Sequence, residues 1–255
     1  MSLQFILSTM RKAVEDYHMI KDGDKVCVGL SGGKDSMVLL KALATYRKFS
    51  PQKFTLGAIT IDMGFKGADF SDMIKFCEEL DVDYHIEHTD IAEIVFDIRK
   101  EPSPCSLCSK MRRGALNTTL KERGYNVLAL GHHADDLIET FLLSLCYEGR
   151  LSTFAPISYM DRSDVTMIRP LIYTREKDIL SVSKDLPIFK NPCPEDKETQ
   201  REFMKELIGK IQKDIPFVKD RMFGAITNSE RYNLWDKYEK FPREDYKKKK
   251  DENND

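Results

Sequence analysis

Residues 25–46 read KVCVGLSGGKDSMVLLKALATY, and this stretch decides the fold. After Lys25, residues 26–30 (VCVGL) are apolar and include two valines, which predicts a short buried strand. Residues 36–46 have the length and composition of a helix. The loop between them places glycines directly before that helix, where free backbone N–H groups and the positive end of the helix dipole attract anions. The stretch therefore predicts a phosphate-binding loop between a strand and a helix.

The loop consists of six residues that suit a nucleotide: Ser31, Gly32, Gly33, Lys34, Asp35 and Ser36. The serine hydroxyls can donate hydrogen bonds, and Lys34 can neutralise phosphate charge. It is not a Walker A loop, because that motif requires a glycine where this chain has Val28. Asp35 is the informative departure, since a carboxylate can bind the Mg²⁺ that bridges phosphates.

Strands and helices alternate over most of the chain. Further strands are expected at residues 54–62, 83–88, 127–131 and 165–169, and helices at residues 3–18, 71–80, 110–123 and 134–147. This alternation predicts an α/β fold with a doubly wound parallel sheet covered on both faces. Ligands in such folds bind beyond the carboxyl ends of the strands, and the turns after Leu30 and Leu130 both fall at that edge.

The pattern changes at about residue 171, where helical segments replace the strands. Helices are expected at residues 175–184, 198–213 and 216–225. We interpret residues 1–170 as the α/β domain with the phosphate loop, and residues 171–240 as a helical extension carrying Cys193. Residues 241–255 are expected to be a disordered polar tail, because residues 247–255 (KKKKDENND) contain no apolar side chain.

Composition and charge set further limits. The chain has 255 residues, 41% of them hydrophobic, which is typical of a globular protein. No apolar run approaches the roughly 18 residues of a membrane span, and the N-terminus lacks the pattern of a signal peptide. A cytoplasmic location without a membrane partner is therefore expected. The net charge of -2 does not by itself indicate a nucleic-acid partner. A local patch of basic residues would be sufficient to bind one.

Three segments together resemble the PP-loop ATP pyrophosphatase superfamily. SGGKDS is similar to its signature loop, and Ile61, Asp62 and Met63 end the second strand, where relatives cradle adenine with backbone atoms. Gly131, His132, His133, Asp135 and Asp136, with Glu139 and Thr140, look like the GHxxDDxxET segment of the members that modify tRNA. The resemblance implies ATP binding at these positions and cleavage between the α- and β-phosphates.

Several of these residues have plainer interpretations. His132 and His133 suit helix capping or the surface, although Gly131 and His132 are assigned to ATP binding by the resemblance. Asp135 suits the start of a helix, where it complements the helix dipole. Asp136 is favoured as a catalytic or Mg²⁺-binding residue, together with Lys34 and Asp35.

The six cysteines fall into two groups. Cys27, Cys77 and Cys146 lie in apolar segments, which predicts small buried side chains. Cys105, Cys108 and Cys193 lie in loop-like sequence. The CxxC pair suits a redox pair, half a zinc site or chance. With Cys193 it makes an incomplete tetrahedron, and an iron–sulfur cluster held by three thiolates leaves one iron open.

CSLCSKMRRGAL with a distant third cysteine resembles the tRNA 2-thiocytidine synthetase family over roughly residues 20 to 200. The resemblance implies a [4Fe-4S] cluster on Cys105, Cys108 and Cys193. Many relatives have a further cysteine shortly after the third, whereas Pro194, Glu195 and Asp196 follow it here. A persulfide route without a cluster, in which one cysteine carries the sulfur and another resolves it, therefore stays open.

A basic segment follows the CxxC pair. The positive charges suit contacts with tRNA phosphates and are those of Lys110, Arg113 and Lys121. The alternative interpretation is that these residues form a solvent-exposed helix face without a partner. Arg112 is expected to point into the site, one turn beyond Cys108, where its charge can stabilise the transferring phosphate. The run of four lysines at 247–250 is more typical of a solubilising tail.

The resemblance implies adenylation of a base carbonyl, most directly C2 of a cytidine, followed by displacement of AMP by sulfur. ATP, Mg²⁺ and the cluster are the expected cofactors. The expected partners are tRNA and a sulfur donor (a cysteine desulfurase or sulfide). A homodimer is one oligomeric state that the sequence allows. A lysidine synthetase would not need the cysteine set, and an archaeal-type 2-thiouridine synthetase would usually carry further zinc-binding pairs. A non-catalytic nucleotide or RNA-binding module would not need Lys34, Asp35 and Asp136.

Overall fold

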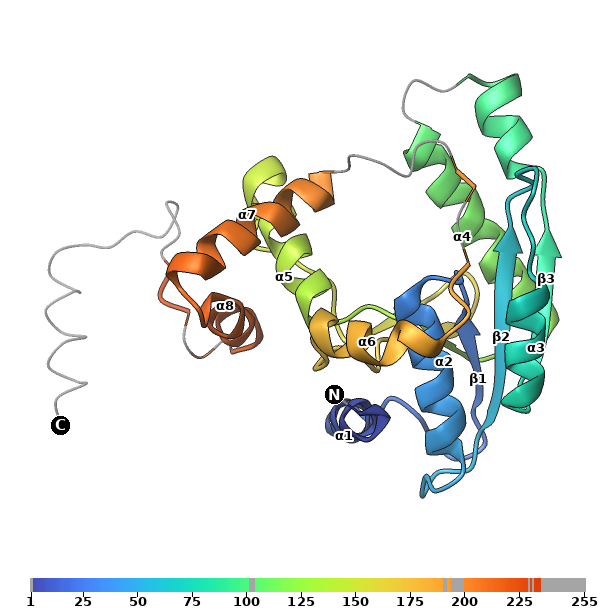
Figure 1. The fold of residues 1–255 in the computed structure, drawn as a ribbon, viewed down its shortest axis with the longest axis horizontal. Helices are drawn as coiled ribbons and strands as arrows, with labels where there is room; N and C mark the ends of the chain where they lie inside the picture. Colours follow the sequence, from blue (N-terminus) through green and yellow to red (C-terminus); the bar gives the residue numbers. More distant parts are fainter. Residues whose placement is uncertain are drawn as a thin grey trace, which may run out of the picture.

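The fold is built on one mostly parallel sheet. The computed structural model describes residues 2–100, 104–189, 192–193, 200–228, 230 and 232–234. Within them the strand order is β3-β2-β1-β4-β6-β5, and all neighbours are parallel except β5 and β6. Figure 1 shows β1, β2 and β3 side by side. The strands are β1 (Lys25–Gly29), β2 (Thr55–Asp62), β3 (Asp83–His88), β4 (Val127–Ala129), β5 (Ile157–Met160) and β6 (Val165–Ile168).

Helices cover both faces of this sheet. The α-helices are α1 (Leu3–Asp16), α2 (Lys34–Arg47), α3 (Ser71–Glu79), α4 (Pro104–Glu122), α5 (Ala134–Leu143), α6 (Glu176–Val182), α7 (Gln200–Asp214) and α8 (Val218–Thr227). Shorter turns are η1 (Glu93–Ile98), η2 (Ser144–Glu148) and η3 (Ser183–Asp185). These elements confirm a doubly wound α/β fold with a helical C-terminal part.

The two faces of the sheet carry two apolar cores, as the period-two alternation of strands requires. Val26 and Val28 of β1 face the larger core, which also holds side chains of α1, α2, α3 and α6. Cys27, between them, faces the smaller core with Leu120 of α4. Near-continuous apolar strands such as KVCVG are typical of a parallel sheet buried on both sides.

Three details of the expected elements are wrong. The hairpin strand β5 was missed. The helix expected at residues 110–123 begins at Pro104, so Cys105 and Cys108 lie on a helix instead of in a loop. The helix expected at residues 134–147 changes to π-helical turns at Ser144. The wider π turn alters which face a residue occupies, and Cys146 is exposed, whereas Cys27 and Cys77 are buried as expected.

The C-terminal helices pack on two different parts of the molecule. Helix α6 contacts α1 and α2, and its Ile179 belongs to the larger core together with Leu171 and Ile172. Helices α7 and α8 pack on α5 and on each other (Figure 1). The predicted tail at residues 241–255 lies outside the described residues. Among the described residues, none of the helices has the length and apolar character of a membrane span.

Candidate active site

The strand order reverses between β1 and β4, and two turns meet there. Strand β1 leads into the loop before α2, and β4 leads into the turn before α5. A Cβ atom at Gly131 would lie 2.9 Å from the carbonyl carbon of Asp35 and 3.0 Å from the backbone nitrogen of Ser36. Only glycine permits this approach of two backbones. The two glycine turns expected at the carboxyl edge of the sheet therefore form one site.

The phosphate loop has the geometry of an anion cradle. Gly32 adopts a φ of +77°, which favours glycine, and Gly33 is the N-cap of α2 without a side-chain capping bond. The hydroxyls of Ser31 and Ser36 lie 3.1 Å apart, and Ser36 donates to the carbonyl oxygen of Gly33 at 2.9 Å. The backbone N–H groups at the start of α2 are thus directed at the loop.

Lys34 is held between two carboxylates. Its Nζ lies 3.1 Å from Asp35 Oδ2 and 3.1 Å from Glu176 Oε1 at the start of α6. Burial alone would lower the pKa of Lys34, but the two acids raise it on balance. Asp35 Oδ1 is buried and accepts no hydrogen bond from a described residue, and His133 Nε2 lies 3.6 Å away. An unpartnered carboxylate oxygen beside a phosphate loop suits a metal ion.

His133 and Asp136 close the turn before α5 as a capping box. The His133 N–H donates to Asp136 Oδ2 at 2.9 Å, and the Asp136 N–H donates to His133 Nδ1 at 3.3 Å. The capping role that the sequence allowed for the histidines is therefore the role of His133. His133 also links the two acids, because its ring lies between Asp35 and Asp136.

Asp135 points away from the phosphate loop and holds the C-terminal helices. Lys219 of α8 donates to its Oδ1 at 2.7 Å, and the backbone N–H of Glu176 donates to its Oδ2 at 2.8 Å. Burial would raise the pKa of Asp135, but these donors lower it below the ordinary value. Asp135 is therefore a structural anchor between α5, α6 and α8.

His132 lies in a mainly apolar stack beside the turn. Its ring is 5.1 Å from that of Phe154, which also lies under the Arg169 guanidinium at 4.8 Å. Burial lowers the pKa of His132 to about 4, with a smaller contribution from the Arg169 charge. His132 is thus a neutral imidazole at pH 7.

Two cations of α7 complete the charge network, and the sequence did not single them out. Arg201 NH1 lies 3.3 Å from Glu139 Oε2 and 3.8 Å from Asp136 Oδ1. Lys205, one turn later, donates to Glu176 at 2.8 Å. Arg201 and Lys205 are four residues apart and therefore lie on the same side of α7, next to the buried Met204 and Ile208. This spacing is the one feature of the sequence that could have indicated that both cations face the rest of the protein.

The segment after β2 is arranged by its own hydrogen bonds. Asp62 Oδ1 accepts from the Gly64 N–H at 3.0 Å, and its Oδ2 lies 2.8 Å from His88 Nδ1. The Asp62 side chain is thus occupied in shaping the turn. The Met63 side chain reaches α4, because Cys108 Sγ lies 3.7 Å from Met63 Sδ.

Two of the three candidate cysteines share helix α4, and the third, Cys193, lies in the segment between η3 and α7. Cys105 and Cys108 lie in the first turns of α4, and burial raises the pKa of Cys108, with smaller effects of Cys193 and Cys105. The Arg112 charge acts in the opposite direction. The thiols are therefore electrostatic neighbours, although no group of three His, Cys, Asp or Glu side chains in the described ranges is set to hold a metal ion.

The basic residues that follow remain on the surface of α4. Lys110, Arg112, Arg113 and Lys121 are all exposed. They surround the helix and are not confined to one face.

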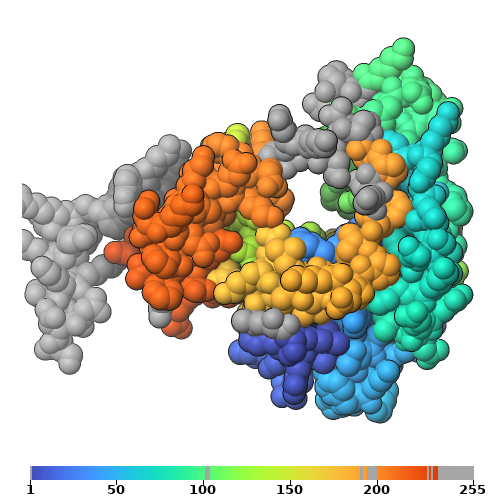
Figure 2. Space-filling model, in the orientation of Figure 1, coloured from blue at the N-terminus to red at the C-terminus, as the bar shows by residue number. Residues whose placement is uncertain are grey.

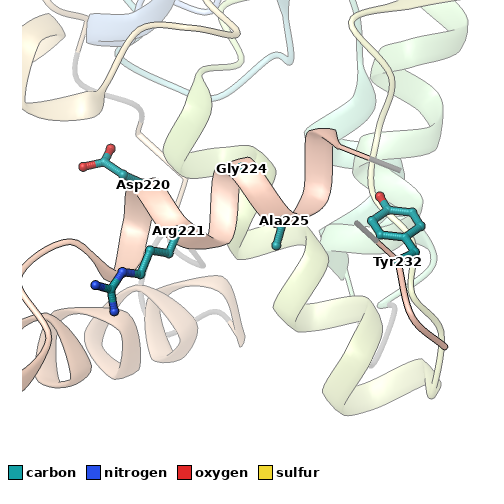
Figure 3. Close-up of a pocket in the computed structure, with 5 residues that line it drawn as sticks. All are labelled: Asp220, Arg221, Gly224, Ala225 and Tyr232. Carbon is teal, nitrogen blue, oxygen red and sulfur yellow. The ribbon is translucent and has the colours of Figure 1, made fainter. Parts of the chain in front are cut away.

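The space-filling view shows a hollow in the molecule (Figure 2). The blue segment of α2 is visible at its floor, with α7 in orange on one side and α6 in yellow below. The position agrees with the ion pairs that join Lys34, Glu176 and Lys205. A separate pocket on α8 is lined by Asp220, Arg221, Gly224, Ala225 and Tyr232 and contains none of the candidate site residues (Figure 3).

Fold and site define a class: a nucleotide-binding α/β protein with a phosphate loop at the switch point of its sheet. The chain matches the PP-loop domain over residues 5–211. It is 38% identical over 237 residues to the tRNA-cytidine(32) 2-sulfurtransferase of Citrifermentans bemidjiense, covering 91% of this chain and 93% of the relative. The same enzyme of Aliivibrio fischeri is 40% identical over 220 residues, 85% of this chain and 72% of the relative. The chain therefore belongs to the PP-loop family, among the tRNA-cytidine 2-sulfurtransferases.

A solved structure of another tRNA thiolase has a similar fold. The U34-tRNA thiolase NcsA from Methanococcus maripaludis with its [4Fe-4S] cluster matches with a TM-score of 0.72 and 29% identity, covering 91% of this chain and 81% of that one. The NH3-dependent NAD synthetase from Campylobacter jejuni, at 15% identity and a TM-score of 0.50, shares the fold.

Proposed function

We propose that this chain is an ATP-dependent tRNA sulfurtransferase that replaces the C2 oxygen of a cytidine by sulfur and forms AMP and pyrophosphate. The placement of the thiols beside the phosphate loop is the main support. Cys108 contacts Met63 after β2, and Phe189, four residues before Cys193, donates its N–H to the Gly32 carbonyl oxygen at 3.0 Å. The curated relatives act on cytidine 32, so we propose that position, in a loop where the base can be unstacked.

In the first step the base oxygen attacks the α-phosphorus of ATP, a new P–O bond forms, and pyrophosphate leaves with the electron pair of the broken bond. Lys34 and the backbone N–H groups after Gly33 bind the phosphates. Asp35 and Asp136 lie on either side of His133 and are the residues that would hold Mg²⁺, and the unpartnered Asp35 oxygen fits that role. Backbone atoms of Ile61 and Met63 would receive the adenine, next to Gly131 and His132.

In the second step sulfur attacks C2, and AMP leaves with the former base oxygen. Cys105, Cys108 and Cys193 are the residues that would hold a [4Fe-4S] cluster, because cysteine thiolates are the usual ligands of such clusters. When bound, such a cluster supplies one open iron for sulfur activation. Arg112 stabilises the thiolates and the departing phosphate charge. Lys110, Arg113 and Lys121 contact the tRNA backbone.

The proposal places the protein in the cytoplasm, where thiols stay reduced, and sulfur comes from a cysteine desulfurase or from sulfide. A homodimer remains the expected assembly.

The experiment is anaerobic purification followed by an iron and acid-labile sulfide assay and a reaction with ATP, Mg²⁺, sulfide and unmodified tRNA. Wild type, Cys108→Ala and Cys146→Ala are compared. Cys146 is an exposed cysteine outside the proposed set and serves as the matched control. We expect about four irons per chain in wild type and in Cys146→Ala. We expect loss of iron and of thionucleoside in Cys108→Ala.

The products distinguish the alternatives. Formation of 2-thiocytidine with AMP and pyrophosphate supports the proposal, and 2-thiouridine would redirect it to another base. Thiolation without iron in this sulfide reaction would remove the cluster from the mechanism and leave free sulfide as the nucleophile that displaces AMP. A persulfide on one of the cysteines would require a cysteine desulfurase with cysteine in place of sulfide, because sulfide alone cannot form a persulfide without an oxidant. The absence of both AMP and thionucleoside from all reactions would refute the proposal.

A further inference from the structure

One carboxylate oxygen beside the phosphate loop is shared by two lysines from distant parts of the chain. Glu176 Oε1 lies 3.1 Å from Lys34 Nζ and 2.8 Å from Lys205 Nζ. Lys34 begins α2, and Lys205 belongs to α7. The two ammonium groups are therefore close neighbours, and like charges so placed need an anion between them.

The charges of this group depend on one another. Burial would raise the pKa of Glu176, but the two lysines lower it on balance. Burial would lower the pKa of Lys205, and the Lys34 charge acts in the same direction. The contact with Glu176 outweighs both and raises the pKa of Lys205. A negative group at this point keeps both lysines charged.

The Arg201 side chain and the Glu176 main chain each have partners outside the Lys34–Glu176–Lys205 group. One turn before Lys205, Arg201 is anchored to Glu139 and to Thr140 of α5 at 3.3 and 3.1 Å. The backbone N–H of Glu176 is bound by Asp135, so the main chain is held independently of the carboxylate. The Lys205 side chain is 42% exposed, so it has room for a ligand as well as for Glu176.

The direction of the nucleotide decides which part of it reaches Lys205. The proposed adenine site follows β2, on one side of the loop that follows β1. Helix α5 follows β4 on the other side, and α7 packs on α5 (Figure 1). A nucleotide that begins at β2 and crosses the loop therefore directs its terminal phosphates at α7.

We propose that Lys205 is a phosphate-binding residue for the β- and γ-phosphates of ATP and for pyrophosphate, and that the Glu176 carboxylate occupies their place in the free protein. In the complex, phosphate oxygens bridge Lys34 and Lys205 as Glu176 Oε1 does without nucleotide. Charge-assisted hydrogen bonds of this kind are among the stronger polar contacts. This inference rests on the proposed function, because it presupposes ATP at the loop.

Isothermal titration calorimetry on the anaerobically purified full chain tests the inference. Mg-ATP, Mg-pyrophosphate and AMP are titrated into wild type, Lys205→Gln, Lys205→Arg and Lys210→Gln. Lys210 is an exposed lysine of the same helix and is the matched control. We expect Lys205→Gln to bind ATP and pyrophosphate about tenfold or more weakly, a loss typical of one charged contact, with AMP binding unchanged. Lys205→Arg keeps the cation and should bind within a few-fold of wild type.

The outcomes separate this inference from the proposed function. If wild type binds ATP and Lys205→Gln binds ATP and pyrophosphate equally well, Lys205 does not contact phosphate and the proposed function is unaffected. A parallel loss of AMP binding, or an equal loss in the arginine variant, would assign Lys205 a structural role instead. A wild-type chain that binds no ATP would refute both.

Discussion

At the scale of single residues, the site depends on glycines and on charges that meet across long sequence separations. Gly131 was marked by its motif, but its physical reason, contact with the backbone of Asp35, requires the folded sheet. Lys34, Asp35 and Asp136 are candidates that the sequence itself indicates, because each lies in a motif and has a side chain suited to phosphate or Mg²⁺. Arg201 is not among them, because its partner Glu139 is 62 residues away and one lysine or arginine in a charged helix looks like another.

Glu139 supplies a prediction about pH. Burial and the neighbouring Asp136 charge raise its pKa to about 7 against the opposing Arg201 charge. The unfolded chain binds fewer protons than the folded one between the ordinary pKa of about 4.5 and about 7, so this residue makes the fold less stable as pH rises through that window. Glu139→Gln removes the effect. We expect the stability of the variant relative to wild type to increase between pH 5 and pH 8.

Urea unfolding at both pH values measures this difference. Glu206→Gln, which changes an exposed carboxyl of α7, is the control and should show no such trend. A relative stability of Glu139→Gln that stays level or falls towards pH 8 would contradict the raised pKa.

At the scale of elements, apolar periodicity located nearly every helix and strand, and the failures share one cause. Pro104 suits the first turn of a helix, yet the polar residues after it look like a loop, so the first turns of α4 were missed. The short strand β5 is paired only with β6 at the edge of the sheet. Local sequence carries little information where tertiary packing decides the conformation.

Helix α8 offers a test of how the C-terminal elements are attached. Lys219 donates to Asp135, which is only 4% exposed. Lys219→Met would leave Asp135 with the Glu176 N–H as its remaining described donor, and removing one partner of a buried pair costs about 3 kcal/mol. We expect that loss in the free energy of unfolding, with faster amide exchange in α8. Lys213→Met, on the exposed side of α7, is the control, and equal stability of both variants would show that the ion pair does not hold α8.

At the scale of the whole molecule, the class of fold followed from the strand–loop–helix order, and the site followed from the rule that ligands bind at the carboxyl edge. The strand order itself did not follow, because no local pattern says that β4 lies next to β1. Nor did the position of α7 on α5, from which Lys205 reaches Glu176. The cations that α7 brings to the site could be identified only after the helices were placed.

The same arrangement predicts how the chain divides. Residues 171–240 were interpreted as an extension and not as a separate domain, and Leu171, Ile172 and Ile179 are buried in the larger core beside α1 and α2. Each such side chain contributes roughly 1.5–3 kcal/mol, so their joint loss approaches the total stability of a domain. We expect a chain ending at residue 170 to lack cooperative unfolding by circular dichroism, whereas a chain ending at residue 246 unfolds like the full protein. Cooperative unfolding of the shorter chain would make residues 1–170 an independent domain, and would separate nucleotide binding from the C-terminal part that carries Cys193 and Lys205.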